Sequence, residues 1–129
     1  MNRYVTDTHA LIWYLVGSSR LGHKARVAFD EAVAGNAQVI IPAIVIAEMV
    51  ILAEKHRTIQ FCELLSELRA ISGFQFVPLT PDTAMAIQRL TILLDIHDRL
   101  ITAEALQQGS ALITADGKIT DSGLVEVVW

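Results

Sequence analysis

The chain contains 129 residues but only one cysteine, three prolines and seven glycines, and only 19% of its residues are charged. A lone cysteine, Cys62, forms no intramolecular disulfide, so a reducing, cytosolic compartment is expected. Prolines and glycines occur singly, and no Pro/Gly-rich linker divides the sequence. The hydrophobic content of 53% excludes disorder. We therefore expect a single domain over residues 1–129.

Long hydrophobic runs are also missing. The most apolar stretch, Val39–Ala53, has 15 residues and contains Pro42 and Glu48, whereas a membrane-spanning helix needs about 20 apolar residues. No signal peptide is recognisable at the start of the sequence. The surplus of apolar residues instead predicts a protein–protein interface, either a dimer seam or a groove for a partner. The candidate segments are Ala10–Val16, Val45–Ala53 and Phe61–Leu68.

Predicted strands and helices alternate along the chain. The segments expected to form strands are Arg3–Thr6, Gln38–Ile41, Phe74–Leu79, Ala111–Thr114 and Leu124–Val128. The segments expected to form helices are Ala10–Val16, His23–Ala34, Pro42–His56, Ile59–Ile71, Pro81–Leu94 and Asp98–Gln108. No two-residue hairpin signal appears between them. This alternation predicts an α/β domain with a mainly parallel sheet of four or five strands, covered by helices on both faces.

Four acidic residues stand in unusual places. Glu48 interrupts the apolar run Ala43–Ala53, which predicts a largely buried helix, and an ionised carboxylate there is costly unless it is paired or metal-bound. A solvent-facing stripe or an arginine partner is the structural alternative. Asp7 and Asp116 each follow a predicted strand, where an aspartate also serves as an ordinary helix cap or turn residue.

The predicted topology brings these acids together. The carboxyl ends of parallel strands share one edge of the sheet, where ligands bind, so Asp7 and Asp116 belong to the same edge. Asp98 opens the helix that leads into the strand ending near Thr114, and Glu48 leans back towards the start of its own helix. Such a cluster repels itself unless a cation is bound. Mg²⁺ prefers oxygen ligands and activates water for attack on a phosphodiester.

Several short motifs resemble the PIN domain, and more narrowly the VapC toxins of toxin–antitoxin pairs. They are a strand followed by Asp7-Thr8-His9, Glu48 in an apolar helix, and the segments Asp95–Ala105, Leu112–Asp116 and Gly123–Trp129. The resemblance covers the whole chain. It implies a PIN-like three-layer fold, Mg²⁺- or Mn²⁺-dependent endoribonuclease activity, a homodimer, and a VapB-type antitoxin that blocks the site.

The resemblance also assigns roles to individual residues. Asp7 and Asp98 are expected to ligate the metal directly, while Asp116 and Glu48 ligate a second metal or orient its water. Two further residues are expected to contact water, phosphate or substrate: Thr114 and Arg99.

Two parts of the sequence depart from the family pattern. Relatives often carry Asp-Pro-Phe-Asp-Arg where this chain has Asp95–Arg99, so His97 replaces an aromatic residue. His97 is therefore either a substrate contact or an idle surface histidine, and Asp95 is either an accessory carboxylate or a helix cap. The role of Asp121 stays open.

The net charge of −4 argues against a long basic RNA-binding groove. The four site acids account for this charge, and two bound Mg²⁺ ions would neutralise it. The cations available for phosphate contacts are Arg20, Lys24, Arg26, Lys55, Arg57, Arg99 and Lys118. Few phosphate contacts predict a shallow salt dependence and recognition of a structured RNA by its shape.

Three other functions are compatible with an α/β domain. A phosphoacceptor receiver needs an acidic pair after the first strand and a lysine after a late strand, and neither is present. A haloacid-dehalogenase-type phosphatase needs an aspartate two residues after Asp7, where His9 stands. A non-catalytic PIN-like protein- or RNA-binding module is the remaining alternative, and it predicts the loss of a site acid, whereas all four are present.

Overall fold

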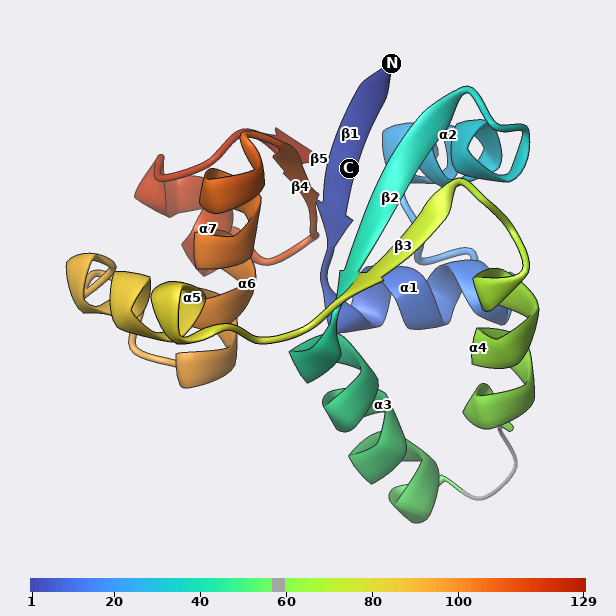
Figure 1. The fold of residues 1–129 in the computed structure, drawn as a ribbon, viewed down its shortest axis with the longest axis horizontal. Coiled ribbons are helices and arrows are strands. Elements are labelled where there is room, and N and C mark those ends of the chain that lie inside the picture. Colours follow the sequence, from blue (N-terminus) through green and yellow to red (C-terminus); the bar gives the residue numbers. More distant parts are fainter. Residues whose placement is uncertain (57–59) are drawn as a thin grey trace.

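The computed structural model describes residues 1–56 and 60–129. A five-stranded sheet runs through the molecule in the order β3-β2-β1-β4-β5, and every neighbouring pair is parallel (Figure 1). The strands are β1 (Asn2–Thr6), β2 (Ala37–Pro42), β3 (Phe74–Val77), β4 (Ala111–Ile113) and β5 (Val127–Val128). The predicted α/β class and the parallel sheet are therefore confirmed.

Helices connect the strands. They are α1 (Thr8–Leu15), α2 (His23–Val33), α3 (Ala43–Lys55), α4 (Phe61–Arg69), α5 (Pro81–Ala86), the 3₁₀ turn η1 (Ile87–Arg89), α6 (Ile96–Gln108) and α7 (Gly117–Ser122). In the ranges that the structure covers, none of them has the length and apolarity needed to cross a membrane.

The sheet is covered on both faces. Ile40 and Ile41 are adjacent on β2, so their side chains point to opposite faces, and both are fully buried. Phe29 of α2 is also fully buried, and its ring stacks on Tyr14 and Phe74 at centroid distances of 4.5 and 6.5 Å. Burial on both faces is the physical reason why the strand sequences are continuous apolar runs.

The chain changes direction across the sheet at β1. From β1 it proceeds outwards through β2 to β3, and it then returns to the other side of β1 as β4 and β5 (Figure 1). Val5 pairs with both Ile40 of β2 and Leu112 of β4. The carboxyl ends of β1 and β4 therefore meet at a topological switch point, the usual place for a ligand site in a parallel sheet.

Helix α3 differs from its prediction. A largely buried helix was expected, but only Val45 and Met49 are buried along it, while Val50 and Ile51 are 43% and 52% exposed. The reason is geometric, because α3 extends away from the sheet and packs mainly through one face (Figure 1). The outer face of α3 is apolar although it is exposed, and for this reason the sequence pattern predicted a buried helix.

Several element boundaries also differ. Pro42 is the last residue of β2 and the N-cap residue of α3, so Ala43, and not the predicted Pro42, is the first residue of the helix. Helix α5 gives way to η1 and ends well before Leu94, and α6 begins at Ile96. The expected start of the α4 helix at Ile59 lies outside the described residues. Helix α7 was not predicted, because Asp116-Gly117 has the sequence of a turn.

Candidate metal centre

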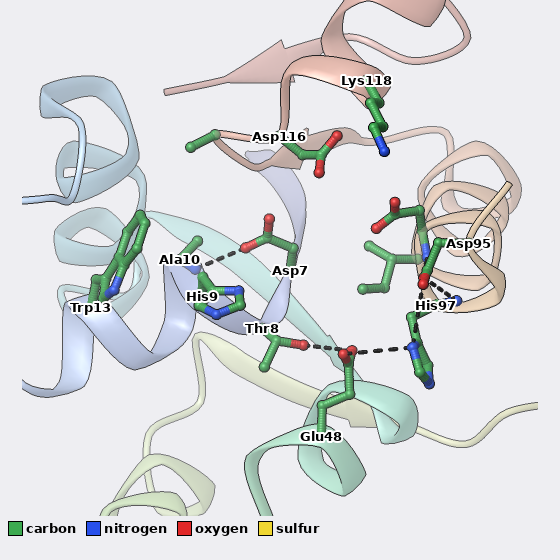
Figure 2. Close-up of a pocket in the computed structure, with 13 residues that line it drawn as sticks. Asp7, Thr8, His9, Ala10, Trp13, Glu48, Asp95, His97, Asp116 and Lys118 are labelled. Atoms are coloured by element: carbon green, nitrogen blue, oxygen red, sulfur yellow. Dashed lines mark hydrogen bonds and ion pairs between the residues drawn. The ribbon is translucent and has the colours of Figure 1, made fainter. Parts of the chain in front are cut away.

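All four predicted acids line one cavity of about 570 Å³ at the carboxyl ends of β1 and β4. Figure 2 shows Asp7, Asp116 and Glu48 around a common space, with Asp95 and His97 at its other side. The lining residues are Asp7, Thr8, His9, Ala10, Trp13, Glu48, Asp95, His97, Asp98, Ile101, Ala115, Asp116 and Lys118. Residues from four helices and two strand ends thus build a single acidic site.

Asp7 is fixed by both its backbone and its side chain. Its N–H donates to the carbonyl of Ile113 at 3.1 Å, which ties the end of β1 to β4. Its Oδ1 caps α1 by accepting from the Ala10 N–H at 2.8 Å, and its Oδ2 accepts from the Thr114 hydroxyl. Burial raises the pKa of Asp7 above its ordinary value, although the bonds from Thr114 and Ala10 oppose this shift.

Asp116 is held in a similar way at the start of α7. Its Oδ1 accepts from the Ile119 N–H at 2.9 Å, and its own N–H donates to the Thr114 hydroxyl at 3.0 Å. Thr114 is fully buried, and its hydroxyl serves both acids. The fully buried Thr114 hydroxyl thus holds both Asp7 and Asp116 in position, and its expected contact with water, phosphate or substrate stays a prediction.

Asp98 lies in the first turn of α6. Asp95 is the N-cap of this helix, since its Oδ1 accepts from the N–H groups of His97 and Asp98 at 2.8 and 3.1 Å. Among the described residues, no hydrogen bond reaches the carboxylate of Asp98. Burial raises its pKa to about 6, and the charges of the nearby acids add to the shift. Those acids are, in decreasing order of effect, Asp116, Asp95, Glu48 and Asp7.

Glu48 projects from α3 into the cavity. Its Oε1 accepts from the Thr8 hydroxyl at 2.7 Å, and its Oε2 lies 3.8 Å from Nδ1 of His97. Its side chain is 27% exposed. In the part of the chain that the structure describes, no arginine or lysine forms an ion pair with Glu48 or any other acid of the cavity. The alternative of an arginine-paired Glu48 is thus not what the structure shows.

The cations take places that differ from expectation. Nε of Arg99, which was expected to contact substrate, donates to the carbonyl of Leu93 and braces the segment before α6, outside the cavity lining. Arg26 donates to the carbonyl of Ser18, and Arg20 lies over the Trp13 ring at 5.9 Å. Lys118 does line the cavity, above Asp116 in Figure 2. Arg57 is outside the described residues.

The donor set has the chemistry of a site for a hydrated Mg²⁺ or Mn²⁺ ion. All its acids supply oxygen ligands, and the ionised carboxylate of Asp98, which accepts no hydrogen bond from the described residues, is destabilised by burial and by neighbouring negative charge. Within residues 1–56 and 60–129, no three such side chains are close enough to hold an ion directly. Mg²⁺ fits this spacing, because it keeps several waters and needs only one or two direct carboxylates.

Sequence reasoning missed two polar side chains of the site. The motif Asp7-Thr8-His9 contains Thr8, but nothing in it indicates that the Thr8 hydroxyl holds Glu48. Lys118 is one of several cations in the sequence, and nothing indicates that helix α7, which the sequence does not predict, brings it to the cavity. Asp121, whose role was left open, is an exposed residue of α7 that does not line the cavity.

Comparison with known proteins gives three results. No curated protein sequence matches this chain. Many solved structures share its fold, including the following three. A toxin–antitoxin complex from Klebsiella pneumoniae is 26% identical, with a TM-score of 0.68 over 98% of this chain and 96% of that one. VapBC2 from Rickettsia felis, bound to a promoter DNA fragment, is 16% identical, with a TM-score of 0.70 over 97% and 96% of the two chains. VapC20 from Mycobacterium tuberculosis, described as a sarcin–ricin loop cleaving toxin, is 16% identical, with a TM-score of 0.66 over 98% and 99%.

The remaining result identifies the family. The family model described as the PIN domain matches residues 4–122, which include every acid of the cavity. The fold and the match agree with the resemblance found in the sequence motifs. The chain therefore belongs to the PIN domain family.

Proposed function

We propose that this protein is a VapC-type toxin, a metal-dependent endoribonuclease that hydrolyses RNA phosphodiester bonds and acts in the cytosol as a single domain. The observation that carries the proposal is the meeting of Asp7, Glu48, Asp98 and Asp116 in one cavity without an arginine or lysine ion pair among the described residues. The similarity to the Klebsiella pneumoniae toxin–antitoxin complex supports it.

The residues of the chain have distinct tasks in this proposal. Asp7 and Asp98 bind Mg²⁺, or Mn²⁺ in its place, while Asp116 and Glu48 bind a second ion or orient water. The bound ion would supply Lewis-acid stabilisation of the phosphodiester and a lower pKa for the attacking water. Thr114 and the N-terminus of α1 hold Asp7 in place, and Lys118 is available for a phosphate oxygen of the RNA.

The proposed partners are a VapB-type antitoxin and a second copy of the chain. The exposed apolar residues of α3 and of the segment before α6 support such interfaces, since Val50 and Ile51 are 43% and 52% exposed and Leu94 is 89% exposed. RNA is the proposed substrate despite the net charge of −4, because bound cations reduce the repulsion at the site.

The test uses the purified chain and total cellular RNA, with 5′-end mapping of the products. We expect new 5′ ends in the presence of Mg²⁺ or Mn²⁺, none in excess EDTA, and none with Asp7→Asn. Activity of the wild type in EDTA would contradict the metal-dependent mechanism. RNA binding without cleavage under any of these conditions would favour the alternative, a non-catalytic PIN-like binding module.

A further inference from the structure

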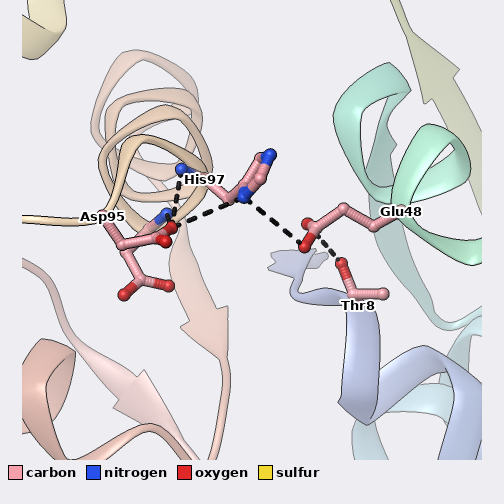
Figure 3. Close-up of polar contacts among 5 residues, drawn as sticks. Thr8, Glu48, Asp95 and His97 are labelled. Carbon is pink, nitrogen blue, oxygen red and sulfur yellow. Dashed lines mark hydrogen bonds and ion pairs between the residues drawn. The ribbon is translucent and has the colours of Figure 1, made fainter. Parts of the chain in front are cut away.

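Among the basic residues that line the cavity, which are His9, His97 and Lys118, His97 is the one that lies within ion-pair distance of its acids in the described part of the chain. Its Nδ1 lies 3.6 Å from Oδ1 of Asp95 and 3.8 Å from Oε2 of Glu48 (Figure 3). Throughout the described part of the chain, these are the only contacts within ion-pair distance between a basic side chain and a carboxylate. His97 also lines the cavity, with 44% of its side chain exposed. An idle surface histidine does not have this arrangement.

The contacts of His97 connect three helices. Thr8 of α1 donates to one oxygen of Glu48, and Nδ1 of His97 of α6 faces the other at 3.8 Å, so the carboxylate of α3 lies between a hydroxyl and an imidazole (Figure 3). Asp95 is itself fixed, because its Oδ1 caps the first turn of α6. The imidazole therefore stands beside one immobile carboxylate and reaches towards a second that comes from another helix.

The distances define how the ring acts. Both exceed the length of a hydrogen bond, so Nδ1 faces the two acids within ion-pair distance without bonding to either. A neutral imidazole protonated on Nδ1 is sufficient as donor. Glu48 needs such a restraint, because it projects from a helix whose outer face is exposed and its side chain has an open path to solvent.

We propose that His97 is a positioning residue that keeps Glu48 turned into the metal centre. This inference rests on the proposed function, in which Glu48 binds an ion or orients water. Residues that hydrogen-bond to metal-binding carboxylates fix the direction of their oxygens, and their loss typically weakens metal affinity or activity about 10- to 100-fold. His97 acts through Glu48 in this way and does not touch the reacting atoms.

The experiment compares His97→Phe, which keeps a planar ring without a donor, with His97→Asn, whose amide nitrogen can replace Nδ1. His23→Phe is the matched control, because His23 is exposed at the start of α2 and does not line the cavity. Three quantities are measured on each purified chain: Mn²⁺ affinity by calorimetry, kcat and KM for a defined RNA, and the thermal unfolding midpoint.

We expect His97→Phe to weaken Mn²⁺ binding and lower kcat by about tenfold, with KM for RNA unchanged because ground-state RNA binding is not affected. His97→Asn should restore most of both losses, and His23→Phe should match the wild type. In a Glu48→Gln background, His97→Phe should have no further effect on Mn²⁺ affinity. The last comparison separates positioning from a general loss of stability, even if His97→Phe lowers the unfolding midpoint.

Three results would overturn the inference. The first is wild-type Mn²⁺ affinity in His97→Phe, and the second is an equal loss in His97→Phe and His97→Asn. The third is a raised KM with unchanged kcat, which would make His97 a substrate contact. If the wild type cleaves no RNA, the proposed function fails, but the Mn²⁺ titrations still decide the role of His97.

Discussion

The hydroxyl of Thr114 donates a hydrogen bond to Oδ2 of Asp7, although the two residues are 107 positions apart in the sequence. The same hydroxyl oxygen accepts the N–H of Asp116 at 3.0 Å. One buried side chain thus sets the positions of two acids that come from the ends of neighbouring parallel strands. Folding and the geometry of the site depend on the same contact.

Replacing Thr114 with valine should therefore affect both properties. Val keeps the shape of this fully buried side chain but leaves the half-buried Asp116 N–H without its acceptor and Oδ2 of Asp7 without its donor. We expect a loss of about 1–3 kcal/mol in the free energy of unfolding, together with weaker Mn²⁺ binding. Urea denaturation and calorimetry measure the two effects. Thr114→Ser, which keeps the hydroxyl, is the control, and a valine variant with wild-type values for both would refute the assigned role.

Asp7→Asn should separate folding from metal binding. Asn caps a helix as well as Asp does, so the bond to the Ala10 N–H survives. Because burial raises the pKa of Asp7, its ionised form destabilises the folded chain at neutral pH, and Asn removes that charge. Asn cannot accept the bond from the Thr114 hydroxyl, and this loss opposes the gain from removing the charge. In EDTA we therefore expect an unfolding midpoint close to that of the wild type. Mg²⁺ should raise the midpoint of the wild type but not of the variant. An equal rise in both chains would exclude Asp7 as a ligand.

The metal-free protein should lose stability as the pH rises. The pKa of Asp98 is about 6 when folded, against its ordinary value of 3.8, so the folded chain binds more protons than the unfolded chain between these values. The contribution of Asp98 to stability is then greatest below about pH 4, falls between pH 4 and 6, and levels off above pH 6. Denaturation midpoints in EDTA from pH 4 to 8 test this, and Asp98→Asn should reduce the fall without removing the part due to Asp7, whose pKa is also raised. If the wild type and Asp98→Asn give identical curves, Asp98 is not the source of the pH dependence.

Gly73→Ala should weaken the packing of β3 on α2. A Cβ at this position would lie 1.9 Å from the carbonyl oxygen of Ala32, and backbone cannot move aside as a flexible side chain can. We expect a loss of about 1–3 kcal/mol in the free energy of unfolding from this overpacking. Gly117→Ala is the control, because its Cβ would meet no atom within 4 Å. Equal denaturation midpoints for the two variants would show that a Cβ at Gly73 does not destabilise the fold.

Much of the architecture follows from local patterns. Three features were predictable because each depends on a few neighbouring residues. They are the apolar strands, the N-cap Thr80 with Pro81, and the left-handed Gly109 after α6. The meeting of the acids followed from topology alone, because parallel strands bring their carboxyl ends to one edge. The roles of these acids as metal ligands stay predictions.

Other features depend on packing that periodicity does not encode. The sequence of α3 is apolar all round, and nothing in it indicates that Val50 and Ile51 are exposed. The inward place of Thr114 depends on hydrogen bonds to residues of other elements. Arg99 lies beside Asp98 in sequence, yet its side chain turns to the carbonyl of Leu93, a contact that the sequence pattern does not indicate.

Asp7 and Asp116 each use Oδ1 to cap a helix. Asparagine performs the same task without the charge. The codons of aspartate and asparagine differ by one base, so a single transition in the gene would disarm the chemistry while leaving the scaffold intact. Under the proposed function, one such base change would give an inactive protein that keeps both helix caps.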